Sequence, residues 1–176
     1  WFLLEDFKLS FLSVFNLPVD TCFSEECFKD QGYFVLKTCQ RTLVVSGENG
    51  RSNAHLNEYI EKMVQGPEAY EFLLEIICGL KSRLLGETEI VAQFKEAYDK
   101  FLLQEKRDSV VTITLQKLFK DAKEVRHNYL SDVGQYSYAG VTKKLITNRG
   151  HGPSILLVGS GQLAKDILKV MSRKFD

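Results

Sequence analysis

The chain has 176 residues, of which 44% are hydrophobic and 26% are charged, and its 23 basic and 23 acidic side chains give a formal net charge of zero. This length and composition predict a globular protein with a sizeable core. The zero net charge argues against tight, nonspecific binding to a polyanion, because such binding depends mainly on Lys and Arg side chains that neutralise phosphates. No apolar run approaches the ~20 residues that span a bilayer, so we expect no membrane partner.

The cysteines of the chain indicate a reduced, cytoplasmic protein without a metal site. They are Cys22, Cys27, Cys39 and Cys78, and neither a CxxC pair nor a histidine at zinc-finger spacing accompanies them. The sequence has no signal-peptide pattern and is not a short, disulfide-dense scaffold, so we expect free thiols. It starts on Trp1 rather than on methionine, and we expect it to be part of a longer protein.

The first 46 residues predict short strands on either side of a polar turn. An alternating pattern over 7–12, the apolar run 33–36 and the β-branched run 43–45 are typical of strands. Residues 38–42, Thr-Cys-Gln-Arg-Thr, fall between the last two runs. The pattern therefore predicts a strand, a site and a second strand.

This turn places a thiol two residues before a guanidinium group. A cysteine attacks as its thiolate, and a nearby arginine lowers the pKa of the thiol while offering a fork that fits a carboxylate. Cys39 and Arg41 are therefore a candidate pair for covalent chemistry on a substrate that carries a carboxylate. One such pair alone is more often structural, because free cysteines are among the most buried residues.

From Asn53 onward the hydrophobic spacing becomes helical. It predicts helices over 53–63, from Pro67 to just before Gly79, over 87–98, from Ser109 onward, and over 138–147. A small sheet followed by several long helices is an α/β protein of the α+β type. The basic residues at helical spacing are interpreted as a solvated face rather than a nucleic-acid site; they are Lys117, Lys120, Lys123, Arg126, Lys143 and Lys144.

A second unit is predicted after residues 148–153, whose glycines and proline mark the best domain boundary. The continuous apolar run 154–158 is typical of a buried parallel strand, and an amphipathic helix follows it. The G-x-G-x-x-A turn between them is the fingerprint of a dinucleotide site, in which glycines let the backbone approach a pyrophosphate. The predicted cofactor-binding residues are Gly159, Ser160, Gly161, Gln162 and Leu163.

We therefore predict two domains: a catalytic domain over 1–150 and the first βα unit of a Rossmann domain over 151–176. One strand and one helix cannot form a stable doubly wound sheet. We expect this chain by itself not to bind the dinucleotide.

Three separated motifs, in this order, resemble the glutamyl-tRNA reductase family. They are 38–42 (Thr-Cys-Gln-Arg-Thr); 79–87 (Gly-Leu-Lys-Ser-Arg-Leu-Leu-Gly-Glu) followed by Gln93 and 95–98 (Lys-Glu-Ala-Tyr); and 158–161 (Val-Gly-Ser-Gly). The resemblance covers most of the chain from Tyr33 onward. It implies an α/β catalytic domain, an NADPH-binding Rossmann domain and a C-terminal dimerisation domain.

The resemblance also implies a reaction. In that family a cysteine attacks the ester that joins glutamate to its tRNA, and NADPH reduces the thioester to glutamate-1-semialdehyde, the precursor of tetrapyrroles such as haem. Cys39 would be the nucleophile, and the residues that would bind the glutamate moiety are Thr38, Arg41, Ser82, Glu87 and Gln93. The implied partners are glutamyl-tRNA, glutamate-1-semialdehyde aminomutase and a second copy of the full-length chain.

The sequence departs from the family pattern around the nucleophile. Gln40 stands where asparagine is expected, Leu43 where glutamate is expected and Lys81 where aspartate is expected. The histidine that the family usually places before the helix leading to Gly79 aligns with Val64. General acid/base catalysis is typically worth ~10²- to 10⁴-fold, so this position matters. Two functions stay open: a reductase, and a degenerate, non-reducing relative that binds tRNA or a protein.

Overall fold

The computed structural model describes residues 9–19, 32–47, 59–131, 137–148 and 154–172. Its N-terminal part is a sheet in which all neighbouring strands are antiparallel, in the order β2-β3-β1-β4. The strands are β1 (Ser13–Leu17), β2 (Phe34–Lys37), β3 (Thr42–Ser46) and β4 (Lys62–Gln65). The pair β2 and β3 confirms the predicted strands on either side of the polar turn.

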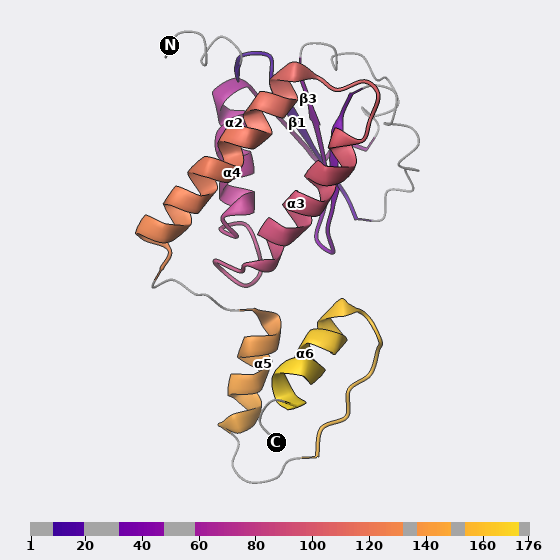
Figure 1. Ribbon diagram of the computed structural model, residues 1–176, viewed down its shortest axis with the longest axis vertical. Coiled ribbons are helices and arrows are strands. Elements are labelled where there is room, and N and C mark those ends of the chain that lie inside the picture. Colours follow the sequence, from indigo (N-terminus) through magenta and orange to yellow (C-terminus); the bar gives the residue numbers. More distant parts are fainter. Residues whose placement is uncertain (1–8, 20–31, 48–58, 132–136, 149–153, 173–176) are drawn as a thin grey trace.

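Helices follow the sheet along the described chain. They are α2 (Gly66–Ile77), α3 (Glu89–Leu102), α4 (Ser109–Tyr129), α5 (Tyr138–Thr147) and α6 (Gln162–Ser172). Figure 1 shows α2, α3 and α4 grouped with the sheet, and α5 and α6 side by side at the other end of the molecule. This arrangement confirms the predicted α+β architecture.

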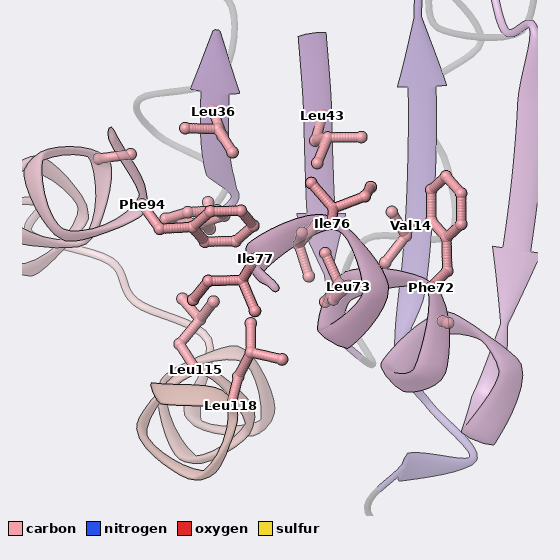
Figure 2. Packing of buried hydrophobic residues seen from close by; sticks show 14 of the residues in the cluster. Val14, Leu36, Leu43, Phe72, Leu73, Ile76, Ile77, Phe94, Leu115 and Leu118 are labelled. Carbon is pink, nitrogen blue, oxygen red and sulfur yellow. The ribbon is translucent and has the colours of Figure 1, made fainter. Parts of the chain in front are cut away.

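The main core lies between one face of the sheet and the three helices α2, α3 and α4. Successive side chains of a strand point to opposite faces, so Val14, Leu36 and Leu43 share the face that these helices cover. Figure 2 shows them packed against helix residues, which are Phe72, Leu73, Ile76, Ile77, Phe94, Leu115 and Leu118. The opposite face carries a smaller apolar cluster, made of Phe15, Leu17, Tyr33 and Val44.

The starts of the helices follow from local sequence. The carboxylate of Asp108 accepts a hydrogen bond from the backbone N–H of Val110 (2.8 Å) and so caps α4. Ser137 caps α5 in the same way, since its Oγ accepts from the N–H of Gly140 (3.0 Å). Pro67 lies in the first turn of α2, where a missing N–H costs no intrahelical hydrogen bond.

Two predicted elements are wrong where the structure describes them. Residues 9–11, predicted as part of a strand over 7–12, form a helical turn, and the strand β1 starts only at Ser13. Residues 62 and 63, predicted as the end of a helix over 53–63, belong instead to β4, in which Val64 pairs with Val14. Pairing with β1 decides the conformation of this short segment, and it overrides the local helical spacing of apolar residues.

The predicted βα unit is present only as its helix. α6 forms as expected, whereas residues 154–158 adopt no strand, and Leu156 and Val158 are 89% and 86% exposed. A strand is held by hydrogen bonds to a neighbouring strand, and no strand in the described part of the chain pairs with this run. The boundary predicted at 148–153 lies, apart from Asn148, outside the described residues, so the division into 1–150 and 151–176 stays a prediction.

Candidate active site

Cys39 lies in the tight turn between β2 and β3. The two strands remain paired as far as Lys37 and Thr42, which leaves residues 38–41 as the turn. The thiol of Cys39 is exposed, whereas that of Cys78 is buried at the end of α2. Between these two described cysteines, only Cys39 is accessible to a substrate; the other two cysteines of the chain lie outside the described residues.

Thr38 fixes the backbone of this turn. Its Oγ1 accepts hydrogen bonds from the N–H of Gln40 (3.2 Å) and of Arg41 (3.1 Å), and it donates to the carbonyl of Arg41 (3.1 Å). The N–H of Thr38 also donates to that carbonyl, at 2.9 Å. A threonine hydroxyl that satisfies neighbouring backbone groups stabilises a local turn, so Thr38 holds Cys39 in a defined place.

The loop 79–87 supplies the second wall of the site. It folds back on itself at Gly79, which has φ +76° and whose carbonyl accepts from the N–H of Gly86 (3.0 Å). A Cβ at Gly79 would lie 2.8 Å from both the backbone N and the O of Glu87. Both the positive φ and this close approach require glycine. Within the loop, the hydroxyl of Ser82 donates to the Glu87 carboxylate at 3.1 Å.

Arg126 of α4 holds the two ends of this loop together. Its Nη1 donates to the carbonyls of Cys78 (2.8 Å) and Glu87 (3.1 Å), and its Nη2 donates to the carbonyl of Gly86 (2.9 Å). The planar fork of a guanidinium group suits several acceptors at once. The predicted solvated face is therefore wrong for Arg126, which is half-buried and acts as a structural clamp.

Arg41 joins the turn to the loop. Its Nη2 donates to the backbone carbonyl of Lys81 at 2.8 Å. The side chain of Lys81 is directed elsewhere, to an ion pair with Glu75 at 2.9 Å. The guanidinium group of Arg41 is thus held to the loop by a hydrogen bond from its Nη2.

The turn, the loop and α3 line a small cleft that is open to solvent. Every residue predicted for catalysis or glutamate binding lines it: Thr38, Cys39, Arg41, Ser82, Glu87 and Gln93. The structure therefore brings these residues together, although their roles stay predictions. The polar and charged side chains of this lining fit a small, polar ligand group.

Two carboxylates give the cleft an acidic wall. Glu87 is 7% exposed and is hydrogen-bonded to Ser82. Glu89, the first residue of α3, is half-buried, and burial raises the pKa of its carboxyl group, with the charges of Glu87 and Asp166 adding to the effect. Gln93 lies one helical turn beyond Glu89, on the same side of α3.

Val64 does not belong to this cleft. Its side chain is 9% exposed, lies in the main core and points from β4 toward the helices. The residue aligned with the family's usual histidine therefore sits among apolar side chains. The predicted cofactor residues are also apart from the cleft lining, since 159–163 form an exposed turn at the start of α6.

The structure adds residues to the cleft that were not predicted to act in catalysis or glutamate binding. They are Gln40, Ile76, Lys81, Glu89, Ile90 and Tyr138. Glu89 could have been found from its position two residues after Glu87 at the start of a helix. Tyr138 carries no sequence signal, because α5 brings it to the cleft from a distant part of the chain.

None of the described helices has the length and apolar character that crossing a bilayer requires. In the same part of the chain, no group of three or more His, Cys, Asp or Glu side chains is arranged to hold a metal ion.

These features define a small α+β domain with an accessible thiol in a polar cleft. Residues 19–129 match the sequence model of the N-terminal domain of glutamyl-tRNA(Glu) reductase. The chain therefore belongs to the glutamyl-tRNA reductase family. This match covers the turn of Cys39, the loop 79–87 and the helices α2 to α4.

Individual relatives agree with this assignment. The glutamyl-tRNA reductase of Thermoplasma acidophilum is 30% identical over 148 residues, which are 82% of this chain and 34% of that protein. The enzyme of Methanopyrus kandleri is 29% identical over 151 residues, 82% of this chain and 37% of that protein. The chain thus spans about a third of the length of these curated relatives.

A solved structure shows the same fold. Glutamyl-tRNA reductase from Methanopyrus kandleri superposes with a TM-score of 0.65 and 23% identity, over 94% of this chain and 47% of that chain.

Proposed function

We propose that this chain carries the thioester-forming site of a glutamyl-tRNA reductase, with Cys39 attacking the ester that joins glutamate to tRNA. The observation that carries the proposal is the cleft itself. It gathers an exposed thiol, the guanidinium of Arg41 and the hydrogen-bonded pair Ser82 and Glu87. Nucleophile and substrate-binding groups in one cleft are the arrangement that covalent catalysis needs.

The proposed step conserves atoms and electrons. The thiolate sulfur of Cys39 forms a bond to the ester carbonyl carbon, and the bond from that carbon to the ribose oxygen breaks. The released ribose oxygen takes up a proton, so the tRNA leaves with an intact hydroxyl group. An aminoacyl ester is already activated, and thioester formation lets the bulky tRNA depart before reduction.

Arg41 and Gln93 are the proposed glutamate ligands. The Arg41 guanidinium uses its Nη2 for the hydrogen bond to the carbonyl of Lys81. Because a guanidinium group has several N–H donors, it can also pair with the carboxylate of a ligand. The Gln93 side chain offers both an amide N–H and a carbonyl to the same ligand. Ser82 and Glu87 would bind its ammonium group, because a buried carboxylate favours a cation.

NADPH is the proposed cofactor of the full-length protein. Gly159 has φ +117° and neither it nor Gly161 would bring a Cβ within 4 Å of another group. An open glycine turn that leads into α6 fits a pyrophosphate at a helix N-terminus. The residues proposed to hold the cofactor are Gly159, Ser160, Gly161, Gln162 and Leu163. NADPH bound there would supply the hydride that reduces the Cys39 thioester to the aldehyde.

We place the product, glutamate-1-semialdehyde, at the start of tetrapyrrole synthesis in the cytoplasm. An aminomutase that consumes this reactive aldehyde is the proposed partner, and a homodimer is the proposed state of the full-length protein.

The proposal is tested by acyl transfer to the 176-residue chain. With tRNA carrying radiolabelled glutamate, we expect the label to appear on Cys39 and to be released by neutral hydroxylamine, as a thioester is. Cys39→Ser should abolish this adduct, because an unactivated hydroxyl group is a poor nucleophile. Cys78→Ala, which removes a buried thiol, should keep it.

A folded chain that binds charged tRNA without forming an adduct would reject the catalytic function. That result would instead support the second candidate function, a non-reducing relative that binds tRNA. That second candidate is favoured by one observation: Val64, which aligns with the family's usual histidine, lies in the main core and does not line the cleft.

A further inference from the structure

Tyr138 reaches the cleft from an element that the family match does not include. It is the first residue of α5, nine residues beyond the matched range 19–129. The cap that Ser137 provides to Gly140 fixes this first helical turn, and the neighbouring Ala139 is buried. The backbone of Tyr138 is therefore held, although its place in the cleft could not be read from the motif.

The phenol of Tyr138 lies in the immediate electrostatic surroundings of the nucleophile. It lines the same cleft as Cys39, and it interacts electrostatically with Cys39, Glu87 and Arg83. The other charged groups that line this cleft are Arg41, Lys81 and Glu89.

The phenol of Tyr138 keeps its proton at neutral pH. Burial is the largest cause that raises the pKa of Tyr138 above its usual value of ~10, and Glu87 and Cys39 add to the effect. The backbone of Leu84 and the side chain of Arg83 act in the opposite direction without cancelling it. A protonated phenol can donate its O–H to an acceptor in the cleft.

We infer that Tyr138 is the hydrogen-bond donor to the acyl oxygen of the ester that Cys39 attacks. This inference rests on the proposed function and names a further catalytic residue for it. As the Sγ–C bond forms, the carbonyl electron pair moves to oxygen, and the phenol O–H stabilises that charge without losing its proton. When the bond to the ribose oxygen breaks, the pair returns and the carbonyl of the thioester is restored. A donor that is in place before the reaction stabilises the developing charge without further reorganisation.

The test compares Tyr138→Phe with the unchanged 176-residue chain in single-turnover acylation by glutamyl-tRNA. Removal of one oxyanion donor typically costs ~10²- to 10³-fold in rate, and we expect a fall of that order. Binding of glutamyl-tRNA should change by less than about threefold, because the phenyl ring remains. Tyr129→Phe is the matched control, since Tyr129 ends α4 and is 74% exposed; it should acylate at the original rate.

Alkylation of Cys39 by iodoacetamide separates catalysis from structure. This reaction attacks a saturated carbon and develops no oxyanion, so Tyr138→Phe should leave its rate and pH profile unchanged. Equal losses in acylation and alkylation would show a merely structural role and overturn the inference. An unchanged acylation rate would also overturn it while sparing the proposed function. No acylation in the original chain would overturn both.

Discussion

Glu89 is the carboxylate of the cleft whose pKa is raised by its surroundings. Burial comes first among the causes that raise its pKa, followed by the charges of Glu87 and of Asp166 in α6. Because the folded state holds this proton more tightly than the unfolded state does, the folding stability contributed by Glu89 falls as pH rises. The residue is therefore a small source of instability at neutral pH.

Replacing Glu89 with Gln should stabilise the chain in a pH-dependent way. Both proteins should unfold alike below the usual glutamate range, ~4.3, where the carboxyl group is protonated in either state. As pH rises through that range and the raised pKa, the variant should gain about 0.2–1 kcal/mol, the usual size for a partly exposed charge. Urea unfolding at several pH values measures the difference.

A second variant on the same helix serves as the control. Glu96 is exposed and pairs with Lys100 at 3.1 Å, so Glu96→Gln should gain no stability at neutral pH. A pH-independent gain in Glu89→Gln would contradict the electrostatic explanation.

At the scale of elements, the site depends on helix α4, which carries none of its lining residues. The carbonyls that Arg126 binds, those of Cys78, Gly86 and Glu87, belong to the end of α2 and to the loop 79–87. Hydrogen bonds from a charged group each contribute about 1.5–3 kcal/mol, although such values do not add in a shared network. The packing of α4 on α2 thus fixes the wall that holds Ser82 and Glu87.

Arg126→Met should lower the free energy of unfolding by about 3 kcal/mol, because buried carbonyls lose their donor. Arg126→Lys should recover only part of this, since an ammonium group cannot reproduce the fork. Chemical denaturation measures both, and Lys123→Met, an exposed change on the same helix, should have little effect. Full recovery by lysine would show that charge alone holds the loop.

The elements that sequence predicted correctly are those with strong local signals. The capped helices α4 and α5, and the strands β2 and β3 around a polar turn, belong to this group. The strand β4, whose first two residues the apolar spacing assigns to a helix, is too short to show alternation, and only its pairing with β1 defines it. The sequence motifs identified the residues of the turn and the loop that line the cleft. The place of Tyr138 and the contacts of Arg126 depend on tertiary packing, which no local pattern encodes.

At the scale of the whole molecule, the structure has a well-packed part and a lightly packed part. The sheet and helices α2 to α4 share one core. α5 and α6 pack on each other, α6 contains no buried residue, and several of its apolar side chains are exposed, including Leu163 and Leu168 (Figure 1). Segments with little buried apolar surface open at lower free energy than the core.

Native-state hydrogen exchange should reveal this division. Amides of α6 should exchange at least about 100-fold faster than those of β3, whose five residues are all buried, because the latter exchange only on global unfolding. Mass spectrometry of peptides from the two elements measures the ratio in one sample. Equal protection would mean that α6 and the sheet unfold as one cooperative unit.

The hydrogen bond from Arg41 to residue 81 also bears on how this family can vary. Its acceptor is a main-chain carbonyl, which every amino acid has. The hydrogen bond therefore does not depend on which side chain occupies position 81. Replacement of the expected aspartate by lysine at position 81 therefore leaves the hydrogen bond of Arg41 in place. In comparisons of homologues, tolerance at position 81 and intolerance at position 41 are to be expected together.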